Sequence, residues 1–242
     1  MLKAVTFDLW DTLLTDRDLL DRMALRATRL REALAPLGVY PGDEELERAF
    51  AESWRNFDRA WTTEHRTPST AESIDVALGA LGVDAPTATR AAITRTMEDL
   101  VTEVPPVPVE GAPEVLAELA GRYRIGLVSD TGLSPGRALR PVLDGHGLLK
   151  HFTFLYFSDE GGMSKPDPRV FALVLEKLGA RPSEAAHVGD ILRTDIAGAQ
   201  AAGMHAVHFV GVNASDAAWS TADRVIEHLR DLPAALDALS DA

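Results

Sequence analysis

The hydrophobic pattern divides the chain into two kinds of segment. Leu2–Leu9 is an apolar, β-branched run that ends at the polar pair Asp11-Thr12, which predicts a buried strand followed by a loop. Further apolar runs predict strands at 124–129, 152–157, 185–189 and 205–210, and helix-like sequence follows each but the last. A short strand and a closing helix are expected between residues 224 and 239. This alternation predicts an α/β fold with a doubly wound parallel sheet.

Between residues 15 and 104 the apolar positions recur at steps of three and four instead, which predicts about four helices. The second apolar stripe contains Trp54 and Trp61, so both are expected in a helical core. Ser69-Thr-Ala-Glu72 has the spacing of a capping box and predicts the start of the third helix. Val104-Pro-Pro-Val-Pro108 predicts an irregular hinge, because proline lacks an amide hydrogen.

Composition narrows the classes of partner. The chain has 24 basic and 37 acidic residues and a formal charge of -13, which disfavours nucleic acid and anionic membranes. It has no cysteine, which excludes thiolate catalysis and disulfides. Acidic residues interrupt the first apolar run where a signal peptide needs none. We therefore expect a cytoplasmic protein, monomer or homodimer, that binds a small molecule and neither nucleic acid nor a membrane.

Four motifs carry the candidate chemistry, and in an open parallel sheet ligands gather where strands end. In chain order they are Phe7-Asp-Leu-Trp-Asp-Thr-Leu13, Leu127-Val-Ser-Asp130, Ser164-Lys-Pro-Asp-Pro168 and Val188-Gly-Asp-Ile-Leu-Arg-Thr-Asp195. Together they resemble the ordered motifs of the haloacid dehalogenase superfamily of hydrolases. The resemblance implies a Rossmannoid core of residues 1–14 and 105–242, with an α-helical cap of residues 15–104 inserted after the first strand.

The resemblance also implies roles for individual residues. Asp8 would be the nucleophile, and Lys165 would hold the nucleophile and the substrate together. Mg²⁺ would be bound by Asp8, the backbone carbonyl of Trp10, Asp190 and Asp195, and the substrate by Ser129, Asp130, Trp10 and Thr12. Elementary chemistry agrees, because a carboxylate attacks an anionic phosphoryl group only where cations screen the repulsion.

One position departs from the family pattern. Most phosphatases of the family place a second Asp two residues after the nucleophile, where it protonates the leaving group, and here that residue is Trp10. Asp11 is not expected to replace it, because adjacent side chains of an extended chain point to opposite sides. Trp10 itself either stacks on the substrate or packs as an apolar residue.

Three functions stay open, and phosphate-ester hydrolysis is the one we favour. A Mg²⁺-dependent phosphatase would act on easier leaving groups, or would borrow its acid from Asp130 or from the cap, where His65 and Arg66 are candidates for substrate contact. A 2-haloacid dehalogenase has an aromatic residue at the second position and needs no metal, but its fourth motif differs. A degenerate, non-catalytic binding module is the third. The phosphonoacetaldehyde hydrolases use a cap lysine, and residues 15–104 contain none.

Overall fold

Six parallel strands form one sheet in the order β5-β4-β1-β6-β7-β8. The computed structural model describes residues 1–16 and 19–240, so residues 17–18 and 241–242 of the predicted ranges lie outside the described residues. The strands are β1 (Ala4–Phe7), β4 (Arg124–Ser129), β5 (Phe154–Phe157), β6 (Ala185–Gly189), β7 (His205–Phe209) and β8 (Arg224–Ile226). All strands expected from apolar runs are present, and their parallel pairing is confirmed.

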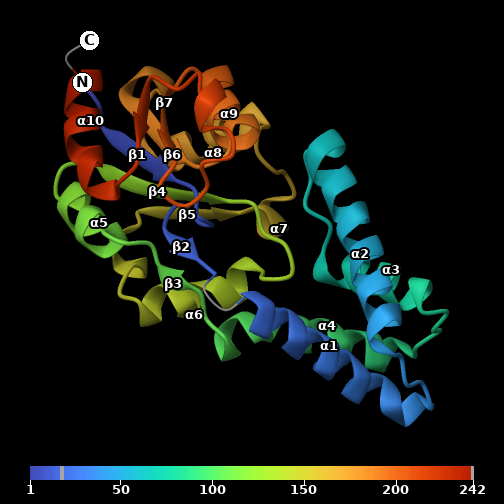
Figure 1. Ribbon diagram of the computed structural model, residues 1–242. Helices are drawn as coiled ribbons and strands as arrows, with labels where there is room; N and C mark the ends of the chain where they lie inside the picture. Colours follow the sequence, from blue (N-terminus) through green and yellow to red (C-terminus); the bar gives the residue numbers. More distant parts are fainter. Residues whose placement is uncertain (17–18, 241–242) are drawn as a thin grey trace.

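Helices cover both faces of this sheet, which confirms the doubly wound fold (Figure 1). One face packs on α5 (Ala112–Ala120), α6 (Gly136–Gly145) and α10 (Leu232–Ser240). The other packs on α8 (Pro168–Leu178) and α9 (Ala197–Ala201), while α7 (Ser158–Gly161) follows β5 directly. Side chains alternate along β1 accordingly, because Val5 and Phe7 belong to the first core and Ala4 to the second.

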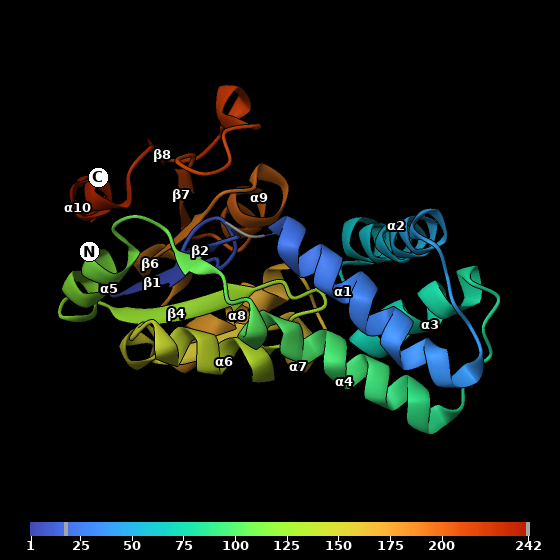
Figure 2. The same cartoon turned by 60° about the horizontal axis from the view of Figure 1, so that its bottom comes forward.

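Four further helices lie beside the sheet and pack mainly on one another (Figures 1 and 2). They are α1 (Leu19–Leu34), α2 (Asp43–Arg59), α3 (Thr70–Ala80) and α4 (Thr87–Glu103), and we call them the helical insertion. Their separate core includes Leu30, Leu34 and Leu78. The capping box forms, with Ser69 Oγ accepting from Glu72 N at 3.1 Å and Glu72 Oε2 accepting from Ser69 N at 2.7 Å. Among residues 1–16 and 19–240, no helix is both long and apolar enough to cross a bilayer.

Two expectations about the insertion are wrong. The expected irregular hinge contains a two-residue strand, β3 (Val107–Pro108), which pairs antiparallel with β2 (Leu14–Thr15). Proline is tolerated there because a two-stranded ribbon leaves one edge without partners. Trp54 is 62 % exposed and Trp61 is half-buried, so neither belongs to the helical core. The stripe that carries them forms the wall of a cavity described below.

Candidate active site

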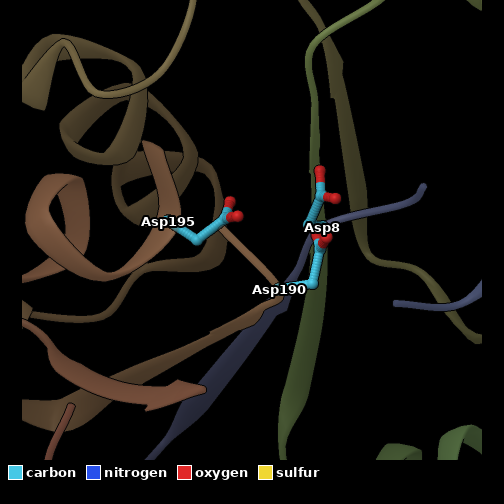
Figure 3. A group of neighbouring side chains, drawn as sticks. All are labelled: Asp8, Asp190 and Asp195. Atoms are coloured by element: carbon cyan, nitrogen blue, oxygen red, sulfur yellow. The ribbon is translucent and has the colours of Figure 1, made fainter. Parts of the chain in front are cut away.

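Three buried aspartates meet at the carboxyl end of the central strands. Asp8 follows β1 and Asp190 follows β6, the neighbouring strand, so the ends of the two strands place them together. Asp195 comes from a single π-helical turn, Leu192–Ile196, that faces them (Figure 3). One oxygen of each carboxylate lies within 4.8 Å of the other two. We call Asp8, Asp190 and Asp195 the carboxylate trio.

A single buried ammonium group compensates part of this charge. Lys165 is 2 % exposed, and its Nζ lies 2.5 Å from Asp8 Oδ1 and 2.6 Å from Asp195 Oδ1. Two further contacts fix the Asp195 carboxylate itself. Its Oδ1 also contacts His187 Nε2 at 3.2 Å, and its Oδ2 accepts from Ile191 N at 3.0 Å. Asp195 therefore positions Lys165 against the expected nucleophile.

Asp190 has a different environment, because one of its oxygens has no donor. Its Oδ2 accepts from Asn213 Nδ2 at 3.0 Å, whereas Oδ1 is buried without a hydrogen-bond partner among the described residues. Orphaned buried carboxylate oxygens are costly. The Asp190 oxygen and the neighbouring Asp8 carboxylate together offer the hard oxygen ligands that Mg²⁺ prefers. The donor set of the site therefore fits the metal.

The pKa values of the trio reflect an excess of negative charge. Burial raises the pKa of Asp8 well above its usual range. The positive charge of Lys165 lowers this pKa, but repulsion by Asp195 and Asp190 offsets part of that effect. Burial and the nearby Asp195 also raise the pKa of Asp190 to about 7. Burial would raise the pKa of Asp195 too, but Lys165 and His187 outweigh it and lower that pKa. An additional cation would relieve this excess.

The residues expected to bind the substrate fall into two groups. Trp10 and Asp130 line a cavity of about 370 Å³ above the trio. The hydroxyls of Ser129 and Thr12 are buried without partners among the described residues, but neither residue belongs to that cavity wall. Asp130 Oδ1 accepts from Lys165 N at 3.0 Å and Oδ2 from Trp61 Nε1 at 2.8 Å, and burial raises its pKa.

The helical insertion supplies the opposite wall of this first cavity, through Arg22, Arg26, Trp54, Phe57 and Trp61. The guanidinium carbon of Arg193, in the π-helical turn after β6, lies 4.2 Å from the centre of a Trp61 ring, close enough for a cation–π contact. His65 and Arg66 lie elsewhere: the His65 carbonyl accepts from Ser164 N at 2.8 Å, and Arg66 pairs with Glu64 and Glu72.

The backbone at Asp11 differs from the extended geometry expected there, and that expectation is wrong. The chain is not extended there, because Asp11 has a left-handed backbone with φ of 53°. Asp11 lines the first cavity with Asp8 and Asp190, and its charge contributes to the raised pKa of Asp190. Its Oδ1 accepts from Thr15 Oγ1 at 2.8 Å. An acid is therefore present in the cavity although the usual position holds Trp10.

Sequence reasoning missed four residues of the site. His187 is a buried histidine within an apolar strand, and Thr6 Oγ1 lies 2.8 Å from its Nδ1. That isolated polar position was the available signal. Asn213 lies in a predicted loop with no motif around it, and Arg26 and Arg193 resemble ordinary surface arginines in a one-dimensional pattern.

Comparisons with known proteins identify the family of this chain. Residues 2–203 match the haloacid dehalogenase-like hydrolase family. The human haloacid dehalogenase-like hydrolase domain-containing protein 3 is 30 % identical over 89 % of this chain and 84 % of its own length. A glyceraldehyde 3-phosphate phosphatase of Methanopyrus kandleri is 29 % identical over 84 % of this chain and 82 % of its own.

A solved structure extends the likeness to the whole fold. The crystal structure of a 2-haloacid dehalogenase from Pseudomonas syringae pv. Tomato DC3000 aligns with a TM-score of 0.73 and 29 % identity, over 98 % of this chain and 99 % of that one. The match over residues 2–203 includes all four motifs and the helical insertion. This chain therefore belongs to the haloacid dehalogenase-like hydrolase family.

Proposed function

We propose that this hydrolase is a Mg²⁺-dependent phosphatase that acts on a small phosphorylated metabolite through an aspartyl-phosphate on Asp8. The observation that carries the proposal is the charge of the site. Among the described residues, three buried carboxylates face one ammonium group, and a buried Asp190 oxygen has no hydrogen-bond donor. Displacement of halide by a carboxylate needs no second cation, whereas attack on a phosphoryl group does.

Each residue of the site has a part in this reaction. Asp8 attacks phosphorus, the ester oxygen leaves with the bonding electrons and takes up a proton, and water then attacks phosphorus to release phosphate and regenerate Asp8. Lys165 offsets charge on the nucleophile and the phosphoryl oxygens, and Asp195 positions Lys165. Ser129 and Thr12, near the ends of β4 and β1, offer hydroxyls that have no partner in the described part of the chain and that could donate to the phosphoryl oxygens.

Mg²⁺ would be held by Asp8, Asp190 and the backbone carbonyl of Trp10, with Asp195 close by. When bound, it supplies Lewis-acid stabilisation of charge on the phosphoryl group. In the same proposal, residues 15–104 act as a cap that closes over the core formed by residues 1–14 and 105–242, which excludes water from the cavity. The Methanopyrus relative, named a phosphatase, supports this function.

The competing function is 2-haloacid dehalogenation, which the Pseudomonas syringae relative and the aromatic Trp10 favour. The two functions differ in metal requirement and product. Phosphate release from para-nitrophenyl phosphate and acetyl phosphate, and chloride release from 2-chloropropionate, should be measured with Mg²⁺ and with EDTA. We expect phosphate release with Mg²⁺ only. Chloride release in EDTA would replace the proposal with a dehalogenase, and neither product together with no Mg²⁺ binding would indicate a non-catalytic module.

A further inference from the structure

Of the residues that the structure describes, three cationic side chains line the first cavity, and carboxylates already compensate two of them. Lys165 pairs with Asp8 and Asp195. Arg22 on α1 is 2 % exposed and donates to both oxygens of Asp16, at 2.8 and 2.6 Å. Its remaining donors reach the Val104 carbonyl. Both cations therefore already have carboxylate partners within the protein.

Arg26, one helical turn after Arg22, is the exception. Among the residues that the structure describes, no carboxylate lies within ion-pair distance of it, and its buried Nε has no hydrogen-bond partner. Burial, and then the charge of Arg22, lower the pKa of Arg26 to about 10, so the guanidinium remains charged at neutral pH. Arg26 is half-buried, and a cation that is partly removed from water without a partner is unfavourable unless an anion joins it.

The position of Arg26 suggests where that anion comes from. Arg26, Trp54 and Phe57 line both the first cavity and a second one of about 710 Å³, which lies between the helical insertion and the segment after β4 that contains Gly132 and Leu133. Apolar side chains dominate the second wall, among them Met23, Leu46 and Phe50. Arg26 is therefore the polar group where the two cavities meet. A ligand that starts at the carboxylate trio and extends into the insertion passes it.

We propose that Arg26 binds a second anionic group of the substrate, so that the substrates are phosphate monoesters whose other end carries a carboxylate or a further phosphate. This inference rests on the proposed function, in which Asp8 receives the phosphoryl group. The planar guanidinium fork matches both kinds of anion. An uncompensated cation is also what a chain of net charge -13 needs in order to hold a substrate with two anionic ends.

The test compares alkyl phosphates of stepwise increasing length that end in a hydroxyl, a carboxylate or a second phosphate. At the chain length that gives the highest kcat/KM, esters that end in a carboxylate or a second phosphate should exceed the hydroxyl-ended ester in kcat/KM by about tenfold or more. Arg26→Gln should reduce this ratio to near one, mainly through KM, because the contact holds ground state and transition state alike. Arg26→Lys should keep part of the ratio.

The matched control is Arg29→Gln on the same helix, since Arg29 pairs with Glu32 and Glu103 and lines neither cavity. It should keep the wild-type ratio. Calorimetric binding of the carboxylate-ended ester to Asp8→Asn, with and without Arg26→Gln, makes the same comparison without turnover. We expect at least about tenfold weaker binding without Arg26.

The outcomes separate the two proposals. If the wild type hydrolyses hydroxyl-ended esters but shows no preference for an anionic end, or if Arg26→Gln keeps the preference, the Arg26 inference is overturned and the phosphatase stands. If no ester releases phosphate while 2-chloropropionate releases chloride, the proposed function fails. Equal binding of the carboxylate-ended ester by the two Asp8→Asn proteins overturns the inference independently of turnover.

Discussion

The sheet core and the helical insertion present their charges to the cavity in different ways. In the core, Lys165, Asp195 and His187 form a closed network in which each group is fixed by another. In the insertion, Arg26 faces the cavity without a carboxylate partner among the described residues. A closed network suits groups that must be ready before any substrate arrives, because preorganised charges need no rearrangement during reaction. The unpaired cation suits selection of a ligand. We therefore expect the core to determine the rate of the reaction and the insertion to determine which substrate binds.

The largest expected loss comes from removing the one compensating cation of the core. Lys165→Met should lower kcat/KM for phosphate esters by about 10²–10³-fold, since a preorganised charge at the reacting group is lost. Lys177→Met, at an exposed position on α8, is the matched control. Steady-state kinetics with circular dichroism of both variants checks this. An active, folded Lys165→Met would place the chemistry outside the core network.

The second prediction concerns the group that protonates the leaving oxygen. Asp11 is the candidate, because it lines the first cavity where the core meets the insertion. Asp11→Asn should lower the ratio of alkyl phosphate to para-nitrophenyl phosphate turnover by about tenfold or more, since only the alkyl leaving group needs a proton. The double variant Asp11→Asn with Trp10→Asp should restore the ratio of alkyl phosphate to para-nitrophenyl phosphate turnover. If Asp11→Asn leaves the ratio unchanged, the leaving group takes its proton from another group.

A third prediction concerns metal and pH. The folded, metal-free protein has Asp190 with a pKa of about 7 against an ordinary 3.8, so it binds an extra proton between these values. The contribution of Asp190 to stability is therefore present at low pH and is lost as pH rises through 7. Asp8, with its raised pKa, acts in the same direction, whereas the lowered pKa of Asp195 has its effect only in strong acid.

Because Mg²⁺ competes with that proton, it should raise Tm more at pH 8 than at pH 5.5. Saturation at about a hundredfold above Kd corresponds to about 2.7 kcal/mol. Differential scanning fluorimetry measures the shift without turnover, and Asp190→Asn should remove most of it at both pH values. Equal shifts at the two pH values in the wild type would show that Asp190 does not bind the metal.

The smallest effect is expected at the contact between the two regions. Trp61→Phe removes the hydrogen bond to Asp130 but keeps a ring beside Arg193. We expect kcat/KM to fall by about threefold to tenfold, the range of one hydrogen bond of this kind. Trp219→Phe, at a 71 % exposed position, is the control. An unchanged kcat/KM would mean that this contact does not help to close the cavity.

The sequence predicted the sheet well because its strands are buried on both faces. Arg124–Ser129 and Ala185–Gly189 have the expected bounds, since each apolar run stops at the polar residue that enters the site. The ribbon of β2 and β3 was missed because two paired residues leave no periodic signal, and Pro108 argues against any strand.

The site was predictable only where a motif carries it. Asp8, Lys165, Asp190 and Asp195 are brought together as the ordered motifs implied. Asp11 was misjudged because a single left-handed residue reorients its side chain, which no periodicity reveals. Trp54 was misjudged because an apolar stripe looks the same whether it faces a core or a cavity. The role of Arg26 could not be predicted, because it depends on which groups surround the side chain in the fold, and a sequence pattern does not contain that information.

The central claim, that Asp8 accepts a phosphoryl group, can be tested by rapid acid quenching during turnover followed by peptide mass spectrometry. With Mg²⁺ and acetyl phosphate, we expect the peptide that contains Asp8 to gain the mass of one phosphoryl group, and we expect Asp8→Asn to show neither the gain nor turnover. Steady phosphate release by the wild type with no modified peptide at any quench time, or by Asp8→Asn at the wild-type rate, would contradict it.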